Sequence, residues 1–315
     1  MSACPTCLAE SNQQGRLVYD AHHECAHFSR NPELQPILCS RKLFECGGDG
    51  GTLLYLPPFS SAELSKLYKV YTGQRTLRLT HPRPIAQAAL IKEHVLDHWH
   101  HRWPVHVVEI GCAGAFMLAI LARSMRSGRL TCFEADQKMA SASATMLDNI
   151  AQQSGGNIST RLIRSFFDPS LLIGEHDLAD VFASSHVVEH IPDPCPWLSG
   201  VHRLLRPGGH VMTEIPDQHQ FALVDQKKLI VGQFHATYFD AGSFDRMMTR
   251  MGFETLFNST FYHSPGWAAR FMHKRVHLAL DDRSVNGTQL REARTRLSVQ
   301  EHEQPLMRSG TSPSQ

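Results

Sequence analysis

The sequence predicts a doubly wound α/β domain with a mostly parallel sheet, preceded by a small cysteine-rich module. Strand-like apolar runs alternate with helical patterns through the middle two thirds of the chain, which indicates a parallel sheet with helices on both faces. Five of the eight cysteines lie in the first 46 residues, whereas the last residues are polar and contain few large apolar side chains. We therefore expect a module over residues 1–75, an α/β domain over 76–280 and a disordered tail over 281–315.

Composition limits the partners that the chain can be expected to bind. With 315 residues, 42% of them hydrophobic, the chain is long enough for one large domain and a small one. A formal net charge of +1 gives no argument for a nucleic acid or a membrane surface. The absence of a leader-like start and of an apolar run of about 18 residues favours a cytoplasmic protein with mostly reduced cysteines.

The expected elements follow from periodicity and from turn residues. Pro82 and Pro84 are expected to interrupt the chain before a helix, and Pro207, Gly208 and Gly209 are expected to form a tight turn into a strand. Strands are expected at residues 52–56, 105–110, 129–134, 159–164, 179–183, 210–215 and 255–261. Helices are expected from Ser60 or Ser61 and at residues 85–98, 116–123, 139–152, 196–205 and 242–251.

A turn of small residues after the strand at 105–110 is the most informative segment. Small side chains at 111–115 allow the backbone to approach a ligand closely. Glu134 follows Gly111 by 23 residues, at the end of the next strand, where an acid can accept hydrogen bonds from both hydroxyls of a ribose. The spacing therefore predicts a nucleoside-containing cofactor. The turn lacks the glycine pattern of a dinucleotide fold, and Glu109 would repel a pyrophosphate.

Four ordered segments resemble the class I S-adenosylmethionine-dependent methyltransferases, whose first motif is Glu/Asp-x-Gly-x-Gly-x-Gly. Glu109 and Gly111 match that motif, whereas Ala113 and Ala115 replace its second and third glycines. The other matching segments are FEAD at 133–136, SSHVVEHIPDP at 184–194 and LLRPGG at 204–209. The resemblance implies a Rossmann-like, seven-stranded methyltransferase fold. It also implies cofactor contacts at Glu109, Gly111, Ala113, Gly114, Glu134, Asp168 and Ser185, with Phe166 and Phe167 as candidates to flank the adenine.

Histidines in two segments are the candidate catalytic groups. His186 and His190 follow the fourth strand, where the methyl group of the cofactor is expected to point, and Glu189 can orient His190. His235 lies in a second segment that resembles the family. In sugar C-methyltransferases the matching stretch reads Tyr-His-Glu-His, but here residues 232–235 read GQFH. The role of Glu189 and His190 can equally be structural.

The function expected from these motifs is methyl transfer from S-adenosylmethionine to a small-molecule or saccharide-like acceptor. The alternative is a non-catalytic, regulatory protein that binds the cofactor on the same fold. A nicotinamide-dependent oxidoreductase is a third possibility, which tight binding of NADH would favour.

The N-terminal cysteines predict a zinc site. Cys4 and Cys7 form one half of a zinc knuckle, and Cys46 and Asp49 are the candidate second half. Alternatively Cys25, Cys39, His22 or His23 completes the ligand set, or the site is empty. The module resembles one that precedes some methyltransferase domains, including sugar C-methyltransferases. The remaining cysteines, Cys112, Cys132 and Cys195, are expected to be small buried side chains.

Overall fold

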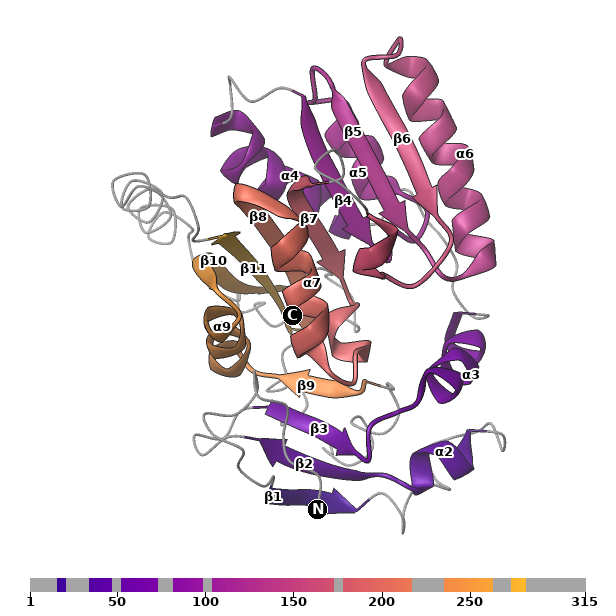
Figure 1. Cartoon of the computed structure of the whole chain (residues 1–315), viewed down its shortest axis with the longest axis vertical. Helices are drawn as coiled ribbons and strands as arrows, with labels where there is room; N and C mark the ends of the chain where they lie inside the picture. The colour runs from indigo at the N-terminus through magenta and orange to yellow at the C-terminus, as the bar shows by residue number, and fades with distance from the viewer. Residues whose placement is uncertain are drawn as a thin grey trace, which may run out of the picture.

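The computed structural model describes residues 16–20, 34–46, 52–72, 82–98, 104–172, 178–216, 235–262 and 273–281. These residues form a central sheet covered by helices, and a smaller sheet beside it (Figure 1). The predicted tail beyond Asp281 lies outside the described residues. Among the helices that the structure describes, none combines the length and the apolar character that crossing a bilayer requires.

The central sheet has the strand order β10-β11-β8-β7-β4-β5-β6. Its five parallel strands are β6 (Ile158–Ile163), β5 (Gly128–Phe133), β4 (Val105–Ile110), β7 (Ala179–Ser185) and β8 (Leu205–Pro216). Two antiparallel strands, β11 (His273–Asp281) and β10 (Phe253–Tyr262), extend the sheet beyond β8. Every residue of β4 is buried, as expected for a strand covered on both faces.

Helices cover both faces of this sheet. Successive side chains of a strand point to opposite faces, so each strand contributes apolar side chains to both layers of helices. Val108 and Ile110 of β4 pack with α7 (Pro194–Leu204) and α9 (Ala241–Arg250), whereas Val105 and Val107 pack on the other face. That second face is covered by α4 (Pro82–His94), α5 (Phe116–Ala122) and α6 (Gln137–Gln153). The doubly wound α/β arrangement predicted from the sequence is therefore present.

Two turn predictions based on proline and glycine were wrong in detail. Helix α4 begins at Pro82 and contains Pro84 in its first turn, because the first N–H groups of a helix need no intrahelical acceptor. A 3₁₀ turn, η2 (Leu96–His98), follows α4. The segment with Pro207 and Gly208 lies within β8, which begins at Leu205 instead of residue 210. A register irregularity between Ala179 and Val181 accommodates it in the pairing with β7.

The smaller sheet is antiparallel, with the order β1-β2-β3-β9. Strands β1 (Arg16–Asp20), β2 (Lys42–Cys46) and β3 (Thr52–Leu56) come from the N-terminal segment, together with α2 (Gln35–Cys39) and α3 (Ser61–Thr72). Strand β9 (Thr237–Phe239) follows β3 by about 180 residues in the chain and pairs with it. The N-terminal segment and the α/β domain therefore share this sheet, across the boundary expected at residue 75.

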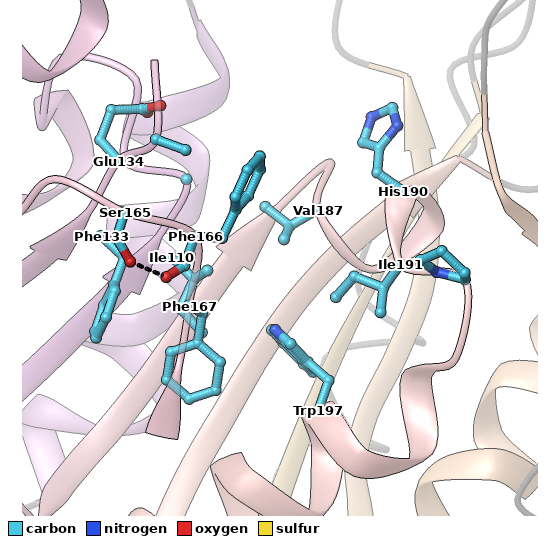
Figure 2. Close-up of a pocket in the computed structure, with 13 residues that line it drawn as sticks. Ile110, Phe133, Glu134, Ser165, Phe166, Phe167, Val187, His190, Ile191 and Trp197 are labelled. Carbon is cyan, nitrogen blue, oxygen red and sulfur yellow. Dashed lines mark hydrogen bonds between the residues drawn. The ribbon is translucent and has the colours of Figure 1, made fainter. Parts of the chain in front are cut away.

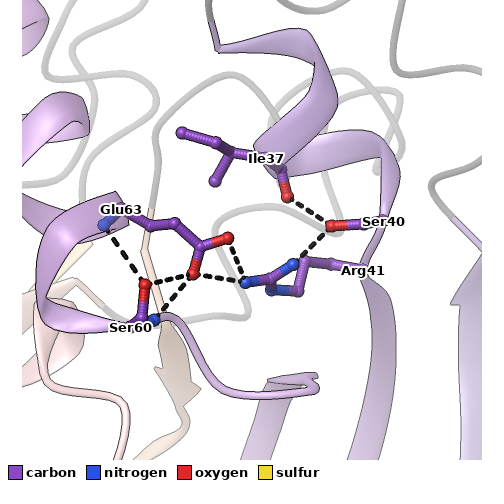
Figure 3. A network of polar contacts seen from close by, with 5 residues as sticks. All are labelled: Ile37, Ser40, Arg41, Ser60 and Glu63. Carbon is purple, nitrogen blue, oxygen red and sulfur yellow. Dashed lines mark hydrogen bonds and ion pairs between the residues drawn. The ribbon is translucent and has the colours of Figure 1, made fainter.

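A polar network fixes the start of α3 against the end of α2 (Figure 3). The carboxylate of Glu63 accepts hydrogen bonds from the backbone N–H and the hydroxyl of Ser60, both at 2.7 Å, and Ser60 Oγ accepts from the Glu63 N–H. This reciprocal pair is a capping box. Arg41 donates to both oxygens of Glu63 at 2.7 Å, and its guanidinium lies 4.8 Å from the ring centroid of Phe59.

Candidate cofactor and acceptor site

The turn after β4 is held against the end of β5 by its own backbone. The N–H groups of Gly111 and Cys112 both donate to the carbonyl of Phe133, at 2.8 and 3.3 Å. Gly111 has a φ of +71°, in the left-handed region, and a Cβ atom there would lie 2.8 Å from Cγ2 of Val187. The loop can therefore approach its neighbours this closely only with glycine at this position.

Ala113 and Ala115 both have left-handed backbone conformations in this turn. Ala113 has a φ of 40°, Gly114 of 102° and Ala115 of 58°. A non-glycine residue in this region costs roughly 1–2 kcal/mol, so the two alanines store strain that glycine would avoid. Such strained residues persist only where the surrounding structure holds them, and here the turn lies between β4 and α5.

Glu134 joins the turn after β4 to the segment that begins α6. Its side chain is only 9% exposed, and its oxygens accept hydrogen bonds from the N–H groups of Ala113 and Asp136, both at 2.9 Å. A carboxylate oxygen can accept more than one hydrogen bond, so this group can also bind a hydroxyl of a ligand. The N–H of Gly114 donates to Ser143 Oγ on α6 at 3.1 Å. The end of β5 and helix α6 thus both bind the turn through hydrogen bonds.

Glu109 is buried beneath the same turn. It is 6% exposed, and its Oε2 atom has no hydrogen-bond partner among the described residues. Burial, and secondly the nearby Glu134, raise the pKa of Glu109 well above the usual range of a glutamate. A buried carboxyl of this kind fits a cationic group of a ligand, because such a ligand would supply the missing partner and favour the ionised form.

We expect Glu109→Gln to stabilise the cofactor-free protein at about pH 8 by at least about 1 kcal/mol. In the unfolded chain this carboxyl ionises above a pKa of about 4.3. In the folded chain its pKa is raised, so stability falls as the pH rises above the unfolded value. Glutamine does not titrate and avoids this loss. Urea unfolding at about pH 8 and about pH 4 tests this, since an equal effect at both values would contradict it.

A cavity of about 210 Å³ extends from the turn towards α7. Figure 2 shows Glu134 at one end of it and His190 at the other, with Phe166 and Val187 between them. The residues that line the cavity are Ile110, Gly111, Phe133, Glu134, Ala135, Ser165, Phe166, Phe167, Val187, His190, Ile191, Pro192 and Trp197. Its walls are mostly apolar and aromatic, which suits a flat heterocycle.

Aromatic packing shapes one wall of this cavity. The ring of Phe167 lies edge-on to Phe133, Phe182 and Trp197, with centroid distances of 5.1, 5.9 and 5.6 Å. Trp197 was not identified from the sequence, although its position near the start of α7, three residues after the matching 184–194 segment, is a usable signal. Asp168, predicted to contact adenine, is exposed and accepts a hydrogen bond from the Ser170 N–H at 2.9 Å. It does not line the cavity.

The residues after β7 bring the predicted catalytic groups together. His186 has a φ of 55°, and its Nδ1 atom lies 2.9 Å from Oε1 of Glu189. Glu189 and His190 belong to a 3₁₀ turn, η5 (Val188–His190). The imidazoles of His190 and His235 lie edge to face, with centroids 5.0 Å apart. Burial, and secondly His190, lower the pKa of His235 well below its usual range, so its imidazole is neutral at neutral pH.

A buried acid on β8 completes the polar side of the site and was not identified from the sequence. Glu214 is fully buried, with Oε1 3.8 Å from His186 Nε2 and 3.6 Å from Arg83 Nε. Gln87 donates to its Oε2, and the predicted cofactor residue Ser185 lies 3.5 Å from the same oxygen. The alternating pattern of a strand predicts only that this position is buried. The sequence therefore gives no signal that Glu214 belongs to the site.

His235 is held in place through the neighbouring residue. The Ala236 N–H donates to the Glu189 carbonyl at 2.7 Å, and the Ala236 carbonyl accepts from the Tyr55 N–H at 3.1 Å. Thr237 Oγ1 donates to the Ile191 carbonyl at 3.2 Å. Because Tyr55 belongs to β3, the N-terminal sheet contributes directly to the position of His235.

The cysteines differ from their predicted states where the structure describes them. Cys112 and Cys132 form a disulfide with a Cα–Cα distance of 5.8 Å, although both were expected to be reduced. The register explains the pairing, because Cys132 lies opposite Glu109 on adjacent strands and Cys112 follows in the turn. Cys46, a predicted metal ligand, is buried at the end of β2 and is disulfide-bonded, as is Cys195. Cys4, Cys7 and Asp49 lie outside the described residues.

Comparisons with known proteins agree with this geometry. Residues 43–256 match the model of the methyltransferase domain family. Among curated proteins, none matches the sequence. A solved structure of Burkholderia thailandensis 1,6-didemethyltoxoflavin-N1-methyltransferase, with bound 1,6-didemethyltoxoflavin and S-adenosylhomocysteine, is similar with a TM-score of 0.50. The identity is 16%, and the match covers 76% of this chain and 95% of that chain.

A second similar structure is magnesium protoporphyrin IX methyltransferase from Synechocystis with bound S-adenosylhomocysteine. It has a TM-score of 0.48 and 13% identity, and the match covers 71% of this chain and 96% of that chain. The family match spans more than half of the sequence and contains the turn, Glu134 and the histidine segments. The chain therefore belongs to the methyltransferase domain family and is an S-adenosylmethionine-dependent methyltransferase.

Proposed function

We propose that this methyltransferase transfers the methyl group of S-adenosylmethionine to a small-molecule or saccharide-like acceptor held beside His190. The observation that carries the proposal is one cavity with a ribose-type acid, Glu134, at one end and His190 at the other. The similar Burkholderia enzyme is named for a small-molecule acceptor, in agreement with this acceptor class.

The residues of the site divide into cofactor and acceptor groups under this proposal. Glu134 would bind the ribose hydroxyls, Phe166 and Phe167 would flank the adenine, and Glu109 would attract the positive charge of the methionine part. The bound cofactor supplies a methyl group on a sulfonium, which is already reactive. The remaining task of the protein is to hold the acceptor in line with that methyl group and to exclude water.

His190 is the candidate group at the acceptor, because it is the predicted catalytic side chain that lines the cavity. An imidazole there can hold or remove an acceptor proton. His186 and His235 would position it, the first through Glu189 and the second through ring contact. The N-terminal sheet would form one wall of the acceptor site, supported by the hydrogen bond between Tyr55 and Ala236.

Zinc binding and a cytoplasmic location stay predictions. Zinc binding by Cys4, Cys7, Cys46 and Asp49 requires reduced sulfur at Cys46, because a disulfide sulfur is not a thiolate ligand. A cytoplasmic location would favour that reduced form.

Transfer of a tritiated methyl group from S-adenosylmethionine tests the proposal, with a panel of sugars, nucleotide sugars, phenols and amines. We expect acceptor-dependent formation of S-adenosylhomocysteine by the wild type. His190→Ala should lower kcat by about 100-fold, the contribution expected from one positioned proton acceptor. Affinity for S-adenosylhomocysteine should remain. Binding of that product without turnover on any acceptor would instead favour the non-catalytic, cofactor-binding alternative.

A further inference from the structure

Three buried side chains at the acceptor end of the cavity form a cluster of metal-ligand type. Glu189 is 1% exposed, His190 6% and His235 4%. One potential ligand atom from each side chain lies within 4.8 Å of the other two. Two imidazoles and one carboxylate are donor groups that transition-metal sites in proteins commonly use.

The backbone brings these residues together without depending on their side chains. Glu189 and His190 are consecutive in η5, whereas His235 follows 45 residues later. The hydrogen bonds from Ala236 N–H to the Glu189 carbonyl and from Thr237 Oγ1 to the Ile191 carbonyl join the two segments on either side of the cluster. A site that is formed in advance in this way loses little conformational entropy when it binds a ligand.

The surroundings of the cluster favour a cation. The cluster combines two imidazoles, each of which can bind a metal ion through a ring nitrogen, with one carboxylate oxygen. His186 Nδ1 lies 2.9 Å from a carboxylate oxygen of Glu189 and can orient it, as outer groups orient metal ligands. Two imidazoles and one carboxylate suit Zn²⁺ and related transition-metal ions more than Mg²⁺ or Ca²⁺.

We infer that Glu189, His190 and His235 bind a divalent transition-metal cation whose open coordination positions face the acceptor. His190 belongs both to the cluster and to the lining of the cavity, so an oxygen atom of the acceptor can reach an ion held there. The acceptor part of this inference rests on the proposed function and narrows it to an oxygen acceptor. In the metal-bound protein His190 is a ligand, and the ion replaces it as the group that promotes loss of the acceptor proton.

Such an ion would lower the pKa of a bound hydroxyl group. The hydroxyl proton would leave to solvent, and the oxygen would form a bond to the methyl carbon. The carbon–sulfur bond of the cofactor would break, and its electron pair would stay on sulfur as S-adenosylhomocysteine forms. The ion changes neither its charge nor its oxidation state, so no further reactant is required.

Titration of the chelator-treated, full-length protein with Co²⁺, followed by absorption spectroscopy, tests this inference. We expect one equivalent to give the visible bands of a nitrogen and oxygen site, without the near-ultraviolet charge-transfer band of thiolate ligation. His190→Gln and His235→Gln should each weaken binding by at least about 10-fold, since even outer partners of metal ligands change affinity by about 10- to 100-fold. His202→Gln is the matched control. His202 packs against Phe253, on the face of the sheet that α9 covers, and does not belong to the cluster.

Parallel titration of each variant with S-adenosylhomocysteine separates this inference from the proposed function. A protein that binds the product but no Co²⁺, or binds Co²⁺ equally well after His235→Gln, overturns the metal site alone. A thiolate band would assign the ion to the cysteines and also overturn it. A protein that binds Co²⁺ at this cluster but no S-adenosylhomocysteine leaves the metal site standing and contradicts the proposed function. Far-ultraviolet circular dichroism checks that each variant is folded.

Discussion

Glu134→Ala is expected to lower the affinity for S-adenosylhomocysteine by at least about 100-fold, equivalent to about 2.7 kcal/mol. Hydrogen bonds to a charged group contribute about 1.5–3 kcal/mol each, and two ribose hydroxyls would donate to this carboxylate. The same side chain accepts from the N–H groups of Ala113 and Asp136, so its removal also releases the turn that surrounds the cofactor. Isothermal titration calorimetry measures the change directly.

Two further variants make this result interpretable. Glu93→Ala removes an exposed glutamate on α4 and should bind as the wild type does. Glu134→Gln keeps the shape of the side chain but lowers its strength as an acceptor, so its affinity should lie between those of the wild type and the alanine variant. Undiminished binding by a folded Glu134→Ala protein would place the ribose elsewhere and contradict the cofactor assignment.

Gly111→Ala is expected to destabilise the fold by about 2–5 kcal/mol and to abolish cofactor binding. The left-handed backbone at Gly111 costs a non-glycine residue roughly 1–2 kcal/mol. In addition, the new methyl group would lie 2.8 Å from Cγ2 of Val187, so the turn or the segment after β7 must shift. Both segments contribute to the cavity. Urea unfolding and product titration together measure the two effects.

Two other glycines separate the backbone cost from the steric cost. Gly155 and Gly156 have φ values of +59° and +86°, on either side of the value at Gly111, and a Cβ atom at either would meet nothing within 4 Å. Alanine at these positions should therefore cost only about 1–2 kcal/mol and leave binding unchanged. If all three variants lose equal stability, close packing against Val187 is not what requires glycine at position 111.

The central sheet and the cofactor half of the site could be predicted largely from local sequence. The strand at 105–110 was predicted with its observed bounds, and the small residues after it identified the turn. Glu134 was found from spacing alone, because parallel strands end at one edge of a sheet. Pro82 and Pro207 were misread, because the sequence does not reveal whether a proline begins a helix or lies in an irregular strand.

The sequence by itself determined that this chain forms a doubly wound α/β domain and binds a nucleoside-containing cofactor, since periodicity and turn chemistry are local properties. Only the tertiary structure decided that β9 pairs with β3 and thereby holds His235 beside Glu189 and His190. It alone also revealed buried Glu214 next to His186. These contacts join segments far apart in the chain, and their formation depends on packing and burial, which no local pattern encodes.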